Sequence, residues 1–159
     1  MRRRTSLGAG LVLGLVCAAA VSAAPPFGFG KKEEKATIAW QKDIFAAHKL
    51  SQTQNKPMLL VFGADWCGYC KKLESQTLTH PELAEYINKT FIPVHLDADK
   101  DEKVTQILEV KGLPCTIILS PQADLIGRID GYHQPSTFYQ KLAAARQTFQ
   151  QVEHRRLAE

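Results

Sequence analysis

Paired metal-ligand motifs are scarce in this sequence. Its 159 residues contain four cysteines and five histidines, and Cys67 and Cys70 form a single C-x-x-C motif. No second C-x-x-C accompanies it, and the histidines show no ligand spacing. Structural zinc takes four ligands, which paired Cys and His motifs usually supply. These absences argue against a zinc site, and we expect neither a metal nor an organic cofactor.

Residues 24–159 also lack a large net charge of either sign. The formal net charge is +4, but residues 1–23 carry Arg2, Arg3 and Arg4 and no acidic residue. Without that segment, 17 basic residues stand against 16 acidic ones. A nearly neutral chain gives no electrostatic reason to expect nucleic acid or an anionic membrane as a partner.

The N-terminus has the pattern of an export signal. Three arginines precede an apolar run at residues 7–21, and Val21-Ser22-Ala23 supplies small residues at the −3 and −1 positions of a cleavage site. This order predicts a secretory signal peptide at residues 1–23. The exported protein would retain Cys67, Cys70 and Cys115. An odd number of cysteines argues against a purely structural disulfide framework.

The remaining residues predict one α/β domain between two polar segments. Residues 24–36 combine proline, glycine and a run of charges without periodicity, which is typical of a flexible linker. Residues 150–159 form a polar C-terminal tail. Between them, residues 37–149 alternate helical and strand patterns, which indicates a mixed sheet flanked by helices.

The unbroken apolar run at residues 58–62 is the clearest strand signal, and it predicts a central strand buried on both faces. The other predicted strands are residues 91–96, with irregular pairing at Pro93, and a hairpin of residues 115–119 and 125–129. Helices are predicted from Thr37 to residue 55, from Cys70 onward, from Pro81, at residues 103–110, and from Pro135 to Phe149.

The C-x-x-C motif directly follows the predicted central strand and opens a helix. There Cys67 would lie exposed among unpaired backbone N–H groups at the positive end of the helix, which stabilises a thiolate. Cys70 follows one turn later on the same face, where it can form a disulfide with Cys67. The arrangement indicates a redox pair, with Cys67 as nucleophile and Cys70 as resolving thiol. A static disulfide is the alternative, which this placement disfavours.

Three motifs, in this order, resemble the thioredoxin superfamily. The first is Ala64-Asp65-Trp66-Cys67-Gly68-Tyr69-Cys70-Lys71 after an apolar strand. Gly112-Leu113-Pro114 is similar to the loop whose proline is cis in that family and faces the cysteine pair, and Gly131-Tyr132 is similar to the turn before its last helix. The resemblance covers about residues 38–145 and implies a thioredoxin fold. The motifs are most similar to the C-terminal domains of DsbD-type thiol:disulfide interchange proteins, whereas Gly68-Tyr69 resembles DsbC-type isomerases.

The resemblance also implies a substrate-binding surface. The segment before Pro114, which includes Leu113, would hold an extended substrate strand beside the cysteine pair by main-chain hydrogen bonds. Gly68 and Tyr69 would contribute from within the motif, and Trp66 would form an apolar rim. The alternative for Trp66 is a packing residue under the loop.

Departures from the family are visible near the cysteine pair. The superfamily has a buried aspartate six residues before the first cysteine, which assists proton transfer at the resolving cysteine, but this chain has Val61. The difference implies slower or differently assisted reduction. Tyr69 stands where thioredoxin has proline, and Asp65 is expected to be exposed. We expect His95 and His133 to be partners of local polar groups.

Cys115 lies outside the C-x-x-C motif and directly follows Pro114. Alternation along a strand should turn its side chain away from the face that Pro114 presents to the pair. We therefore expect a small buried apolar side chain, as is usual for free cysteine. A third thiol ligand for Cu(I) is the alternative.

The expected function is thiol–disulfide oxidoreduction on exported proteins, as a reductase or electron relay in the bacterial periplasm. A disulfide isomerase and a non-catalytic module that binds clients or Cu(I) are the alternatives. The expected partners are proteins with disulfides or thiols and a membrane electron donor. The sequence leaves the oligomeric state open, with a monomer as the expectation.

Overall fold

The computed structural model describes residues 37–158. The predicted signal peptide and linker, at residues 1–36, lie outside the described residues, as does Glu159 at the end of the predicted tail. Across residues 37–158, no helix combines the length and the apolar composition that a membrane crossing requires.

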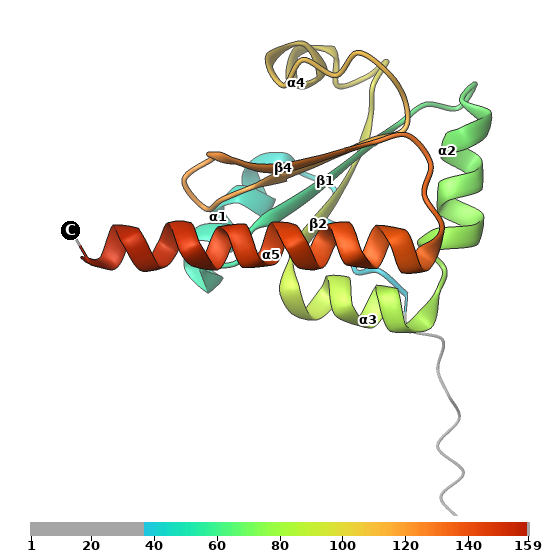
Figure 1. The fold of residues 1–159 in the computed structure, drawn as a ribbon. Coiled ribbons are helices and arrows are strands. Elements are labelled where there is room, and N and C mark those ends of the chain that lie inside the picture. The colour runs from blue at the N-terminus through green and yellow to red at the C-terminus, as the bar shows by residue number, and fades with distance from the viewer. Residues whose placement is uncertain (1–36, 159) are drawn as a thin grey trace, which may run out of the picture. The chain divides into compact units, whose positions relative to one another are not determined.

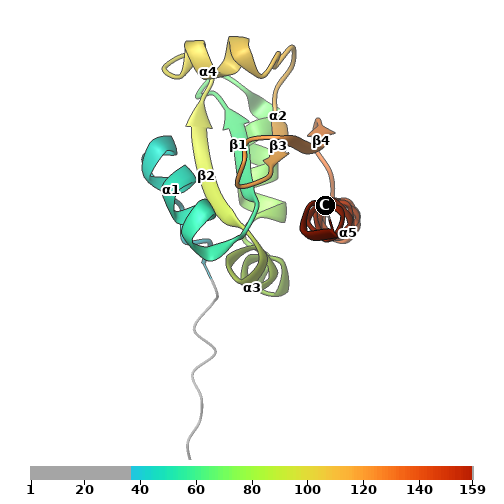
Figure 2. The same ribbon diagram turned by 90° about the vertical axis from the view of Figure 1, so that its left-hand side faces the viewer.

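A mixed four-stranded sheet forms the centre of the domain (Figure 1), and its strand order is β2-β1-β3-β4 (Figure 2). The strands are β1 (Met58–Gly63), β2 (Ile92–Asp97), β3 (Cys115–Leu119) and β4 (Leu125–Asp130). β1 pairs in parallel with β2 and antiparallel with β3, and β3 pairs antiparallel with β4. Every residue of β1 is buried. The predicted central strand and the predicted hairpin are both confirmed.

Helices cover both faces of this sheet (Figure 2). On one face, apolar residues of α1 (Ile44–Gln54) and α4 (Glu102–Ile107) pack with Leu60 and Phe62. On the other face, α3 (Pro81–Thr90) and α5 (Pro135–Ala158) pack with Leu59 and Val61. Side chains of β1 thus alternate between two cores, as the strand period requires.

Two short helical segments lead from β1 to α3. They are α2 (Gly68–Lys72) and the π-helical segment η1 (Leu73–Thr77). In η1 the backbone N–H of Leu78 donates to the carbonyl of Leu73, five residues earlier. Turns of this kind are rare and are often found at functional sites. This one begins three residues after Cys70.

The predicted start of the first helix at Thr37 is wrong. The helix begins at Ile44, after the N-cap Asp43, whose carboxylate accepts a hydrogen bond from the N–H of Ala46 at 2.6 Å. Before it, Gln41 forms a parallel bridge with Val94 at the outer side of β2. The preceding segment therefore packs along the sheet edge and does not extend the helix.

The predicted irregular pairing at Pro93 is also wrong. β2 keeps its register through Pro93, which lies opposite Leu59. The carbonyl of Pro93 accepts a hydrogen bond from the N–H of Gln41 at 2.8 Å, so the polar side of this residue faces away from β1. The missing proline N–H consequently costs no hydrogen bond between the two strands.

The last helix is longer than predicted. α5 continues through Ala158 instead of ending near Phe149, so the polar tail is helical as far as the structure describes it. Arg156 donates to Asp124 at 2.9 Å and to Glu153 at 3.3 Å. The contact with Asp124 connects the final turns of α5 to the turn between β3 and β4.

Candidate active site

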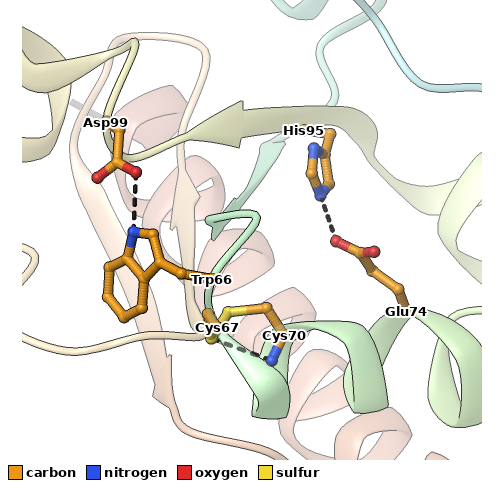
Figure 3. Close-up of a disulfide and its surroundings, with 6 residues drawn as sticks. All are labelled: Trp66, Cys67, Cys70, Glu74, His95 and Asp99. Atoms are coloured by element: carbon orange, nitrogen blue, oxygen red, sulfur yellow. Dashed lines mark hydrogen bonds and ion pairs between the residues drawn. A yellow bond between two sulfur atoms is a disulfide. The ribbon is translucent and has the colours of Figure 1, made fainter.

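Cys67 and Cys70 lie at the junction of β1 and α2, where they form a disulfide (Figure 3). The S–S distance is 2.03 Å and the two Cα atoms are 5.3 Å apart. Cys67 is the N-cap of α2, and its Sγ accepts a hydrogen bond from the backbone N–H of Cys70 at 3.1 Å. Sulfur thereby takes the place of the oxygen that usually caps a helix. A donor of the first helical turn is directed at the sulfur that the sequence marks as the nucleophile.

The predicted exposure of Cys67 is wrong for the disulfide state. The exposed fraction is 6% for Cys67 and 2% for Cys70. The sulfur of Cys67 is bonded to that of the buried Cys70 and accepts a hydrogen bond from the backbone N–H of Cys70. Trp66, Gly68 and Tyr69 around it are exposed. The pair therefore lies directly beneath an exposed rim, which a partner must contact to reach the sulfur.

The loop before β3 lies at the same edge of the sheet as the cysteine pair. Cys115 is paired with Phe62 in the register of β1 and β3, so the loop residues before it adjoin the end of β1 that leads to Cys67. The Leu113–Pro114 peptide bond is cis. The carbonyl of Pro114 accepts a hydrogen bond from the N–H of Gly131 at 2.8 Å, and Gly131 has a φ of 78°, which favours glycine. Leu113 is half-buried beside it.

Trp66 projects from the rim of the pair. Its exposed fraction is 71%, which fits the rim interpretation and not packing under the loop. The indole Nε1 donates a hydrogen bond to Oδ2 of Asp99 at 2.8 Å (Figure 3). Asp99 lies in the turn after β2 and was not among the predicted site residues, because no pattern in the sequence links it to Trp66.

Val61 occupies the position at which the superfamily has a buried aspartate. Val61 is buried in the core that β1 shares with η1. His95 lies opposite it on β2, and His95 Nε2 is 2.9 Å from Oε1 of Glu74 (Figure 3). The Nε2 of His133 lies 3.2 Å from the carbonyl oxygen of Asp130. Both histidines are partners of local polar groups, as predicted.

A polar cavity of about 340 Å³ adjoins the Cys70 side of the site, lined by Gly63, Ala64, Asp65, Lys71, Glu74, His95, Asp97, Lys100 and Asp101. Lys100 Nζ donates to Oδ2 of Asp97 at 2.7 Å. That hydrogen bond lowers the pKa of Asp97 and raises the pKa of Lys100. The cavity thus contains charges of both signs next to the redox pair.

Cys115 lies on the other face of the sheet from the pair. It packs in the core with Leu60 and Phe62, whereas Leu73, which follows the pair, packs in the opposite core. The prediction of a buried side chain turned away from the pair is confirmed. Within residues 37–158, no three His, Cys, Asp or Glu side chains are grouped as metal ligands. The geometry gives no support to a Cu(I) site that joins all three thiols.

Comparisons with known proteins agree with this fold and site. The sequence profile of the family called thioredoxin-like domain matches residues 44–146. The chain is 28% identical over 136 residues to the thiol:disulfide interchange protein DsbD of Klebsiella pneumoniae, which covers 78% of this chain and 23% of DsbD. It is 25% identical over 120 residues to the thioredoxin-related protein DsbJ of Chlamydia pneumoniae, which covers 68% of this chain and 34% of DsbJ. The chain thus spans about a third or less of these relatives.

The fold is similar to that of a solved oxidoreductase. The structure of DsbH oxidoreductase has a TM-score of 0.64 at 18% identity, over 79% of this chain and 95% of DsbH. The thioredoxin fold is therefore confirmed. This fold and the disulfide-forming C-x-x-C pair define a thiol–disulfide oxidoreductase. The chain belongs to the thioredoxin-like domain family.

Proposed function

We propose that the chain reduces disulfides of exported proteins, or relays electrons to them, with Cys67 as nucleophile and Cys70 as resolving thiol. The observation that carries this proposal is the disulfide between the N-cap and the first turn of α2. A pair that closes into a disulfide in this fold can supply two electrons when it starts as two thiols. The resemblance of the cysteine and Gly112-Leu113-Pro114 motifs to DsbD-type domains supports the reducing direction.

Export and the bacterial periplasm belong to the same proposal. The signal-peptide pattern at residues 1–23 supports export. Similarity to a bacterial thiol:disulfide interchange protein supports a compartment in which other proteins carry disulfides. The expected partners are client proteins with disulfides and a membrane protein that returns electrons to the pair.

The reaction has two exchange steps. The Cys67 thiolate attacks a sulfur of the client disulfide, a mixed disulfide forms, and the other client sulfur leaves as a thiolate and takes a proton from water. The Cys70 thiolate then attacks Sγ of Cys67. The Cys67–Cys70 bond forms, the bond from Cys67 to the client breaks, and the electron pair leaves on the client sulfur. The client is reduced by two electrons, and the chain reaches the disulfide state that the structure contains.

The loop before β3 supplies the docking surface in this proposal. Within residues 37–158, the main-chain N–H and carbonyl of Leu113 make no backbone hydrogen bond. An extended client segment can pair with these groups beside Pro114. The exposed side chains of Trp66 and Tyr69, with Gly68 between the cysteines, would contact the residues around the client disulfide.

Trapping of the mixed disulfide tests the proposal. Cys70→Ala should accumulate disulfide-linked complexes with exported proteins through Cys67, whereas Cys67→Ala should accumulate none. Absence of such complexes with Cys70→Ala would contradict exchange as the function. The reduction potential decides the direction, since a value near about −270 mV supports reduction and one near about −120 mV supports oxidation. Rearrangement of a scrambled substrate without net use of dithiol would indicate the isomerase.

A further inference from the structure

Three functional groups converge on Gly63, the last residue of β1. A methyl group placed on Gly63 would lie 3.6 Å from Cβ of Cys70, 3.6 Å from Oε1 of Glu74 and 3.8 Å from Nε2 of His95. Because glycine has no side chain, a small space is left between the resolving cysteine and the Glu74–His95 pair. Glu74 and His95 lie on the opposite side of the disulfide from Trp66 and Asp99 (Figure 3).

The local structure holds both members of the pair in place. Glu74 follows Cys70 by four residues, which is one helical turn, and it lies in the π-helical segment η1. His95 is paired with Val61, two residues before Gly63 on β1, so alternation brings its side chain to the same face as Gly63. The imidazole also packs edge-on against Trp40, with ring centroids 5.6 Å apart. The ring is therefore fixed on one side by an aromatic residue and on the other by the carboxylate.

The pair is also open to water. The side chains of His95 and Glu74 are 38% and 46% exposed. Both line the polar cavity next to Cys70, and both line a second cavity with Trp40 and Lys42. A carboxylate–imidazole pair that lies between Cys70 and solvent can accept a proton from a thiol and release it.

We propose that Glu74 and His95 form a proton-transfer pair that removes the thiol proton of Cys70 through a water at Gly63 when the mixed disulfide is resolved. The inference rests on the roles proposed above for Cys67 and Cys70. It assigns to this pair the proton transfer that the apolar Val61 cannot perform. Glu74 is the proton acceptor, and His95 is a positioning residue that orients the carboxylate and passes the proton on to solvent.

In this step one bond breaks for each bond that forms. The S–H bond of Cys70 breaks, and its proton moves through the water to Oε1 of Glu74 and then through His95 to solvent. The electron pair left on the Cys70 sulfur forms the bond to Sγ of Cys67. The bond between Cys67 and the client breaks at the same time, and the client sulfur leaves with that electron pair. No other oxidant or reductant takes part.

Other charged groups face the pair from the elements around it. Asp65 and Lys71 lie on the side of the cysteine motif, Asp97, Lys100 and Asp101 on the side of β2, and Lys42 in the second cavity. These groups stay in place when Glu74 or His95 is replaced. A change in the release rate of such a variant therefore reports on the replaced group.

A single-turnover assay tests the proposal. A mixed disulfide between Cys67 and an aromatic thiol is formed in the full chain, and release of the aromatic thiol is followed from pH 5 to pH 9. Glu74→Gln should slow release about tenfold or more at neutral pH, on the scale of general-base catalysis, and by less at pH 9, where hydroxide can remove the thiol proton instead. His95→Gln should slow release by a smaller factor. Glu82→Gln, a matched loss of an exposed carboxylate on α3, should leave release unchanged.

Gly63→Ala is a second test that keeps both members of the pair. The added methyl group makes ordinary contacts at 3.6 Å, so the variant should fold, but it occupies the space through which the proton moves. Release should slow in this variant as in Glu74→Gln, while the alkylation rate of Cys67 measured in a Cys70→Ala background stays the same. Equal slowing of alkylation would indicate a general distortion and overturn the proposal.

The sign of the effect separates proton transfer from simple charge repulsion. A carboxylate that only repels a neighbouring thiolate raises its pKa, so removing it would speed release. Unchanged or faster release in Glu74→Gln would therefore overturn the proposal. If Cys70→Ala traps a client but Glu74→Gln releases at the normal rate, the proton-transfer pair fails and the proposed function stands.

Discussion

Sγ of Cys115 donates a hydrogen bond to Oδ1 of Asp130 at 3.4 Å, across the β3–β4 pair. Nη1 of Arg128 lies 3.6 Å from the same sulfur, and this guanidinium also donates to the carbonyls of Leu108 and Glu109. Burial, followed by the hydrogen bond to Asp130, raises the pKa of Cys115 to about 11. Cys115 is therefore a protonated thiol at neutral pH that connects β3 to β4 and, through Arg128, to the end of α4.

Cys115 should resist alkylation in the folded protein. After reduction at pH 7.5, iodoacetamide should modify Cys67 first, and Cys115 should react only after addition of denaturant, because a buried neutral thiol is a poor nucleophile. Mass spectrometry of the digested protein measures both sites. Modification of native Cys115 at the rate of a free cysteine would contradict the prediction.

The raised pKa of Cys115 also predicts a loss of stability at high pH. The folded state holds this proton above the ordinary value of 9.0, so the contribution is fully present below about pH 9 and is lost as the pH rises toward about 11. The free energy of unfolding should fall by on the order of 2 kcal/mol more in the parent than in Cys115→Ala over this interval. Urea unfolding of the disulfide forms measures it, since Cys67 and Cys70 then do not titrate. The same decline in both proteins would exclude Cys115 as its source.

The hydrogen bond from Trp66 to Asp99 predicts a kinetic effect. Asp99→Ala should raise KM for a protein disulfide about two- to tenfold, the net value of one hydrogen bond, because the exposed indole loses its fixed orientation. Asp99→Asn keeps an acceptor and serves as the control. Steady-state reduction of a client separates KM from kcat. A change in kcat alone would place Asp99 in the chemistry and not in docking.

Two leucines of α5 offer a matched test of packing. Leu142 is 0% exposed in the core between α5 and the sheet, whereas Leu157 is 85% exposed. Leu142→Ala should lower the free energy of unfolding by about 2–5 kcal/mol. Leu157→Ala should change it by less than about 0.5 kcal/mol. Denaturant unfolding of both variants gives the comparison, and similar losses would show that the end of α5 is packed against another surface.

The sheet and the cysteine motif could be predicted because their signals are local. The run at residues 58–62 is apolar at every position, which suits a strand covered on both faces. The C-x-x-C motif follows that strand directly, so the helix that it opens places Cys67 at an N-cap without knowledge of the rest of the fold. Hairpin and proline signals placed β3, β4 and α3 in the same way.

Features that depend on contacts between distant segments could not be predicted. The segment before Asp43 has a helical pattern of apolar residues, but Gln41 pairs with Val94 on β2 and that contact prevails. The Glu74–His95 pair depends on the register of β1 against β2 and on a π turn that no sequence rule predicts. The four-residue spacing of Cys70 and Glu74 indicates that the two side chains lie on the same helical face. Only the register of β1 and β2 shows that His95 contacts Glu74.

The outer side of β2 has a consequence for behaviour at high concentration. Pro93 has no N–H to offer there, and its carbonyl is already occupied by Gln41. A foreign strand that approached this edge would meet an interrupted row of donors and acceptors and could not extend the sheet in register. This interruption therefore disfavours uncontrolled strand addition along β2.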